Sequence, residues 1–202
     1  MPTYRKTLPM IAASIMITFA TALTGCSGET AGPGSSPSVS SSHSAEAKAT
    51  HNASDVMFVQ MMTPHHQQAV EMSDLLLSKN NVDPRVRKLA TQIRAAQAPE
   101  IEQMAGWAKS WDVSPTPPAG HDHGGDMGMM DESELEDLRK ADGEPATTLF
   151  LSGMIKHHEG AITMAEEEKA KGSDPAALRL AGDIIATQQA EIDTMKSLQQ
   201  DL

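Results

Sequence analysis

The segment Phe58-Val-Gln-Met-Met-Thr-Pro-His-His-Gln-Gln-Ala-Val-Glu-Met72 occurs a second time as Phe150-Leu-Ser-Gly-Met-Ile-Lys-His-His-Glu-Gly-Ala-Ile-Thr-Met164. Each copy has a Met, two other residues, a His doublet, two residues, an Ala, two residues and a second Met. Chance does not produce agreement at so many positions, so the chain contains an internal duplication.

The similarity continues beyond these segments. Asp83-Pro84 corresponds to Asp174-Pro175, and a run from Gln97 to Met104 corresponds to one from Gln188 to Met195. An Asp that caps a helix, followed by Pro in the first turn, is a strong start signal. Each copy therefore predicts two helices joined by a short turn, over 54–79 and 84–111 in the first copy and over 145–171 and 175–202 in the second.

Two hairpins of this kind bury their apolar stripes by packing together. We therefore predict an all-α fold, a four-helix bundle made of two duplicated helical hairpins. Repeat one covers 54–111, a His/Met-rich linker covers 112–144, and repeat two covers 145–202. The linker should contain a short acidic helix at 133–140 with Ser133 and Glu136 as a capping box. Pro64 and Pro99 should kink or unwind the helices that contain them.

The N-terminal part has the pattern of an export signal. Arg5 and Lys6 precede an apolar run that ends in Leu23-Thr24-Gly25-Cys26, and this tetrapeptide resembles the bacterial lipobox. We expect residues 1–25 to be a lipoprotein signal peptide and Cys26 to be acylated. Residues 26–53 are the flexible Ser/Gly/Pro-rich tether of a protein lipid-anchored to the extracytoplasmic face of the cell membrane. A plain membrane anchor with an incidental Cys is the alternative.

Composition limits the classes of partner. The 202-residue chain has a net charge of −11, which disfavours nucleic acid and anionic lipid surfaces and attracts cations. With one Cys, it can form no internal disulfide and no Cys-rich zinc site. The chain also contains 14 Met residues, so thioether sulfur is an abundant donor.

The helical positions of Met and His predict clusters of metal donors. On a helix, Met61, His65 and Met72 fall within an arc of about 40°. The pairs Met62/His66, Met154/His158 and His157/Met164 are similarly spaced, and Met104 and Met195 share stripes with Gln97 and Glu100 or with Gln188 and Glu191. If the hairpins close, these groups converge. Thioether and imidazole together suit Cu(I) and the similar Ag(I), and imidazole also accepts Cu(II).

Each of these residues has a structural alternative. A Met at helical spacing can be core packing, and one His of each doublet can serve only as a hydrogen-bonding partner. Glu100 and Glu191 are expected to hydrogen-bond rather than to bind metal directly, and Met57 is expected in the core. The linker supplies secondary metal candidates, whose alternative is a polar linker with incidental Met: His121, His123, Met127, Met129 and Met130.

The two Met-x-x-His-His-x-x-Ala-x-x-Met runs, together with Gln-x-x-Glu-Ile-x-x-Met at 97–104 and 188–195, resemble the domain of unknown function 305 family. The resemblance extends from about Asp55 to the C-terminus. It implies a ferritin-like four-helix bundle, usually exported, with copper or silver binding in some members. Thr63-Pro64 departs from the family pattern. The metal-ligand candidates that the resemblance implies are Met62, His65, His66, Met72, Met104, Met154, His157, His158, Met164 and Met195.

The leading functional hypothesis is an exported copper-binding lipoprotein that buffers, sequesters or transfers the metal, with a copper-handling protein as a potential partner. A non-metal structural or interaction module is the second hypothesis. A di-metal oxidase is the third, but that chemistry uses Glu-x-x-His pairs, and the sequence contains none. No nucleophile–base constellation or phosphate loop is present either, so we do not expect an enzyme.

Overall fold

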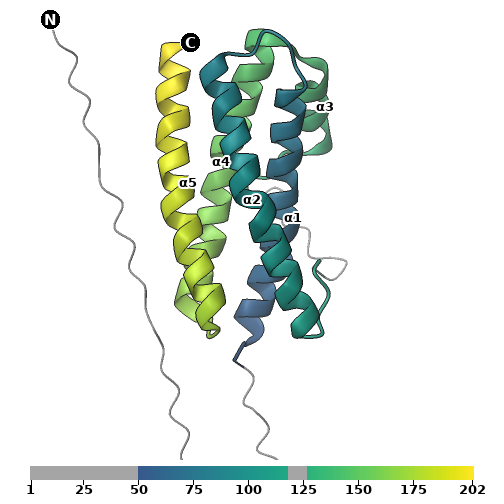
Figure 1. The fold of residues 1–202 in the computed structure, drawn as a ribbon, viewed down its shortest axis with the longest axis vertical. Helices are drawn as coiled ribbons and strands as arrows, with labels where there is room; N and C mark the ends of the chain where they lie inside the picture. Colours follow the sequence, from purple (N-terminus) through teal and green to yellow (C-terminus); the bar gives the residue numbers. More distant parts are fainter. Residues whose placement is uncertain (1–49, 118–126) are drawn as a thin grey trace, which may run out of the picture. The chain divides into compact units, whose positions relative to one another are not determined.

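Five helices make up the regular structure of residues 50–117 and 127–202, the part of the chain that the computed structural model describes. They are α1 (Ala53–Leu77), α2 (Pro84–Ser110), α3 (Glu132–Lys140), α4 (Gly143–Lys171) and α5 (Pro175–Asp201). The four long helices lie side by side and α3 covers one side of them (Figure 1). The predicted signal peptide, Cys26, most of the predicted tether, His121 and His123 lie outside the described residues.

Packing follows the duplication. α1 packs along α2 and α4 along α5, while α1 also packs along α4 and so joins the hairpins. The α2–α5 contact is much smaller. The predicted all-α bundle of two helical hairpins is therefore confirmed.

The helix starts in the two copies are capped as the sequence predicts. The side chain of Asp83 accepts a hydrogen bond from the Arg85 amide, and that of Asp174 accepts from the amides of Ala176 and Ala177. A Pro follows each cap in the first turn, where its missing N–H leaves no bond unmade. These caps fix where each hairpin turns.

One detail of the prediction is wrong, and so is one of the two alternatives given for the prolines. The capping box of α3 pairs Asp131 with Glu134, not Ser133 with Glu136, because an ionised Asp at this position accepts more strongly and complements the helix dipole. In addition, α1 and α2 continue as α-helix through Pro64 and Pro99, without local unwinding. Tertiary packing along both helices outweighs the loss of one backbone hydrogen bond at each proline.

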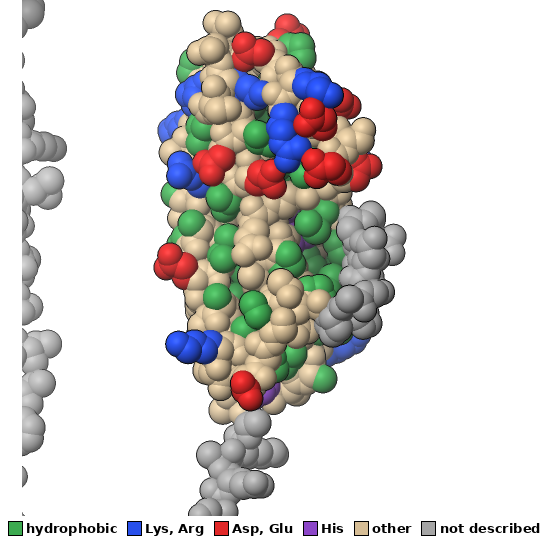
Figure 2. All heavy atoms as spheres, turned by 90° about the vertical axis from the view of Figure 1, so that its right-hand side faces the viewer, with side chains coloured by type: hydrophobic (Ala, Val, Ile, Leu, Met, Phe, Trp, Pro, Cys, Tyr) green, Lys and Arg blue, Asp and Glu red, His purple; other side chains and the backbone are tan. Residues whose placement is uncertain are grey.

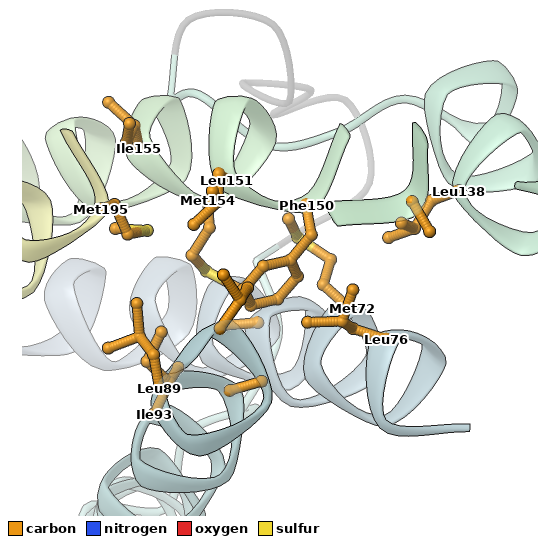
Figure 3. Close-up of a cluster of buried hydrophobic side chains, with 14 of the residues drawn as sticks. Met72, Leu76, Leu89, Ile93, Leu138, Phe150, Leu151, Met154, Ile155 and Met195 are labelled. Carbon is orange, nitrogen blue, oxygen red and sulfur yellow. The ribbon is translucent and has the colours of Figure 1, made fainter. Parts of the chain in front are cut away.

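The apolar core consists of two clusters at different heights in the bundle. The first cluster includes Phe150, Met72, Met154 and Met195, whose side chains enter from α1, α4 and α5 (Figure 3). The second is built around Phe58, with Met62, Met104 and Met164. Along every long helix, buried polar residues separate the part that contributes to one cluster from the part that contributes to the other. This arrangement places a polar layer inside the bundle.

Helix α3 closes one side of the first cluster. Its buried Leu135 and Leu138 pack into that cluster, and Arg139 bridges the carboxylates of Glu71 on α1 and Glu132 on α3. Figure 2 shows charged side chains gathered on this part of the surface, with hydrophobic side chains and few charges elsewhere on the same face. Within the described ranges, none of the helices combines the length and apolar character that crossing a membrane requires.

A buried pair of carboxyl groups ties the start of α1 to the α4–α5 turn. Asp55 and Glu168 are fully or almost fully buried. Burial alone would raise the pKa of Asp55, but hydrogen bonds from the Glu168 carboxyl and from the amides of Asn52, Asp174 and Ser173 outweigh it and lower that pKa to about 2. Burial, followed by the bond to Asp55 and its charge, raises the pKa of Glu168 to about 8. At neutral pH, Glu168 therefore keeps its proton beside ionised Asp55.

This pair predicts a decrease in stability as pH rises. The folded state keeps a proton on Glu168 that the unfolded chain releases near its ordinary pKa of 4.5, so stability declines between about pH 5 and pH 8. One pKa unit corresponds to about 1.4 kcal/mol, so the full shift from 4.5 to about 8 is worth on the order of 5 kcal/mol, of which roughly 3–4 kcal/mol is lost between pH 5 and pH 8. The lowered pKa of Asp55 acts in the opposite direction, but only in acid, where its stabilisation is lost as pH falls from about 4 toward 2.

Urea unfolding of the metal-free protein at pH 5, 6.5 and 8 checks the expectation. Glu168→Gln keeps a hydrogen-bond donor for Asp55 without a titrating proton, so its unfolding free energy should change much less over this range. The control is Glu167→Gln, because Glu167 is the exposed neighbour and should leave the slope unchanged. Equal slopes in wild type and Glu168→Gln would contradict a proton retained on Glu168.

Candidate metal centre

A layer of buried polar side chains crosses the bundle between the two apolar clusters. All four histidines of the repeated doublets belong to it and are at most 1% exposed. Gln97 on α2 and Gln188 on α5 are also buried in it. All four long helices thus contribute to one polar layer.

One histidine of each doublet is held by a carboxylate from the other helix of its hairpin. His66 Nε2 lies 2.9 Å from Glu100 Oε2, and His158 Nε2 lies 2.8 Å from Glu191 Oε2. A carboxylate accepts the bond, so Nε2 carries the hydrogen, and in the neutral ring Nδ1 then has the lone pair. Both Nδ1 atoms are buried without a hydrogen-bond partner. This is how carboxylates orient metal-binding imidazoles.

The other histidine of each doublet faces its counterpart from the other copy. The ring centroids of His65 and His157 are 3.7 Å apart and their planes are inclined by 37°. His65 Nε2 donates to the Met127 carbonyl oxygen at 2.9 Å, which leaves Nδ1 without a partner. Neither ring nitrogen of His157 has a partner.

Burial keeps these two rings neutral. Burial lowers the pKa of His65 to about 3, although the Met127 carbonyl opposes the change, and the charges of His66 and His158 lower it further. Burial and the charge of His65 also lower the pKa of His157 well below its ordinary value. At neutral pH, therefore, protons do not occupy the lone pairs that a metal ion would need.

The donor set fits a soft or borderline ion. A buried polar atom without a partner costs about 1–3 kcal/mol, and a bound ion would remove that penalty. In residues 50–117 and 127–202, no three His, Cys, Asp or Glu side chains are grouped so that they could hold an ion by themselves. The methionines next to the layer would add thioether donors, and thioether favours Cu(I) or Ag(I) over Mg²⁺ or Ca²⁺.

The predicted methionine ligands lie on both sides of the layer. All are buried: Met62, Met104 and Met164 in the second cluster, and Met72, Met154 and Met195 in the first. Met62 precedes His66, and Met154 precedes His158, by one helical turn. The duplication thus provides one thioether next to each carboxylate-held imidazole along its helix.

The linker candidates divide into two places. Met127 packs beside the second cluster, and Met130 is buried in the first. Met129, which lies between these two residues in the sequence, is partly buried. The Met127–Gly128 segment lies directly on α4, because a Cβ at Gly160 would overlap the backbone of Met127 and a Cβ at Gly128, whose φ is +71°, would overlap Lys156. These glycines allow the Met127 carbonyl to reach His65.

Sequence reasoning missed three features. It placed Gln97 and Gln188 on the inward stripes, but not as buried amides that have atoms without partners. It expected Met57 in the core, yet Met57 is 44% exposed, because the buried stripe of α1 runs through Phe58 and Val59 and not through their neighbour. It did not anticipate that Asp55 meets Glu168.

A four-helix bundle with a central layer of carboxylate-held His and flanking Met defines a class of His/Met-lined helical proteins. Residues 55–199 match the family described as "Domain of unknown function (DUF305)". The chain therefore belongs to the DUF305 family, as its repeated motif predicts.

Solved structures of similar sequence share the fold. A DUF305 fragment from Deinococcus radiodurans is 34% identical, covers 75% of this chain and 98% of its own, and gives a TM-score of 0.69. A DUF305 protein from Streptomyces coelicolor is 32% identical, covers 72% of this chain and 89% of its own, and gives a TM-score of 0.67. CopM in its Cu(I)-bound form is 35% identical, covers 73% of this chain and 96% of its own, and gives a TM-score of 0.61. CopM has also been solved in Cu(II)-bound and Ag-bound forms.

A curated viral protein matches a shorter stretch. "Uncharacterized protein L153" of Acanthamoeba polyphaga mimivirus is 47% identical over 49 residues, which are 24% of this chain and 32% of that protein. The match thus spans about a third of the viral protein.

Proposed function

We propose that this protein is an exported, lipid-anchored copper-binding protein that buffers, sequesters or transfers copper at the cell surface. The observation that carries the proposal is the layer of four buried imidazoles, each with a nitrogen that has no hydrogen-bond partner. The structures of CopM with Cu(I), Cu(II) and Ag support it, because CopM is 34–36% identical to this chain over most of both lengths.

The chemistry of the layer favours copper in either oxidation state. Neutral imidazole accepts both Cu(I) and Cu(II), and the methionines supply the softer donors that Cu(I) prefers. Glu100 and Glu191 would hold His66 and His158 in the tautomer that offers Nδ1 to the ion. Because the set contains no thiolate, it is compatible with an oxidising extracytoplasmic compartment.

Export and anchoring are the second part of the proposal. Leu23-Thr24-Gly25-Cys26 supports acylation of Cys26, and the Ser/Gly/Pro-rich stretch after it would let the bundle move away from the membrane surface. The anchor would hold copper near other copper-handling proteins of the envelope.

One preparation tests both parts. The full chain and a Cys26→Ala variant are produced in a bacterial host supplied with copper and a labelled palmitate, then purified in detergent. We expect wild type to carry both the label and bound copper, and Cys26→Ala to carry only copper. Wild type without the label would contradict the anchor, and wild type without copper, even after incubation with Cu(I), would contradict the metal function.

The layer favours binding over oxidase chemistry. A ferritin-like oxidase surrounds two ions with several carboxylates. In the described part of this chain, the layer offers one carboxylate per hairpin, and each is engaged by a histidine. We therefore propose a binding protein, not an enzyme.

A further inference from the structure

Four of the eight residues that line a pocket on one side of the bundle are methionines. The pocket encloses about 250 Å³ and includes Met57 and Met61 of α1, Met164 of α4 and the linker residue Met127. Glu167 and Glu168 also line it, and the lining contains no Lys or Arg. Met164 belongs to the second apolar cluster, and Met61 and Met127 pack against it, but the exposed position of Met57 gives it no core to fill.

The other copy provides an internal comparison. Leu149 and Gly153 occupy the positions in α4 that correspond to Met57 and Met61 in α1, and they line a second pocket. That pocket contains one thioether, from Met130, and its two acidic residues are accompanied by Lys156 and Lys196. The two pockets are built on equivalent helical positions, but only the first contains several soft donors.

The thioether pocket adjoins the histidine layer. Met61 lies one turn before His65 on α1, and Met164 lies two turns after His157 on α4. The backbone carbonyl of Met127 accepts the hydrogen bond from His65 Nε2. The same three segments that supply the methionines therefore also hold the His65–His157 pair.

From this geometry we propose that Met57, Met61, Met127 and Met164 form a second metal site, which captures Cu(I) or Ag(I) at the surface and passes it to the histidine layer. The inference rests on the proposed copper function and adds the point of uptake. Thioethers are neutral and bind soft monovalent ions without releasing protons. Thioether-only ligation also leaves the ion able to move on to imidazole donors.

Silver titration of the full chain, labelled with ¹³C at the Met methyl groups, tests this site. Ag(I) is diamagnetic and shares the ligand preference of Cu(I). We expect the methyl signals of the four pocket methionines to shift together on addition of Ag(I). The double variant Met57→Leu/Met61→Leu keeps apolar volume. In this variant, the Ag(I) concentration that half-shifts the Met127 and Met164 signals should rise at least about tenfold. The matched control, Met130→Leu in the second pocket, should leave the shifts unchanged.

The outcomes separate this site from the function as a whole. If Ag(I) shifts the methyl signals of Met62 and Met154, which flank the histidine layer, but not those of Met57 and Met61, the surface site is refuted and the copper function stands. If no methyl signal moves, both are refuted. An unchanged response of Met127 and Met164 in the double variant also refutes the site.

Discussion

Replacing His157 with leucine should stabilise the metal-free protein and weaken its copper binding. Both ring nitrogens of His157 are buried without a partner, so the native residue leaves polar atoms unsatisfied at a cost of about 1–3 kcal/mol. Leucine has a similar volume and would pack against the His65 ring without that penalty. The same change removes a donor from the layer, so we expect Cu(I) affinity to fall at least about tenfold.

His158→Leu is the matched comparison, one residue further along α4. His158 donates to Glu191, so its loss leaves a largely buried carboxylate without its donor and should destabilise the protein. Urea unfolding of the metal-free proteins and competition of each variant with a Cu(I) chelator give the two measurements. If His157→Leu destabilised the protein as much as His158→Leu, the proposed difference in hydrogen bonding between the two histidines would be contradicted. If His157→Leu left the Cu(I) affinity unchanged, His157 would no longer be a proposed ligand.

Gly160→Ala should destabilise the protein by on the order of 2–4 kcal/mol, although alanine is the better helix former. The added Cβ would overlap the backbone carbonyl of Met127, so the linker must lift away from α4. Since that carbonyl accepts from His65 Nε2, the change would also remove the partner of a buried imidazole. We expect faster release of bound copper, because the linker no longer covers His65.

Gly106→Ala is the control for this change. Gly106 lies inside α2, and a Cβ there would meet no atom within 4 Å. Without a clash, the higher helix propensity of alanine should stabilise the protein by up to about 1 kcal/mol. Thermal unfolding and limited proteolysis of the linker compare the two variants. If Gly160→Ala were as stable as Gly106→Ala, the linker would not be seated on α4 as described.

The duplication made most of the fold predictable, because each helix start and each buried stripe appears twice in the sequence. It also led to the prediction that imidazoles and thioethers converge once the hairpins close. Asp55 and Glu168 could not be paired in this way. Their equivalents in the other copy are Thr147 and Leu76, so the contact has no repeated signal. The Met57 error has a similar origin, because the apolar pattern of α1 continues around the helix and conceals which side faces outward.

His65 and His157 come from different copies, so the facing imidazoles belong to halves of the bundle that are connected covalently only through the linker. An ion shared between them would cross-link the two hairpins, and separating the hairpins would require breaking its coordination. Loading the protein with copper would therefore make it harder to unfold.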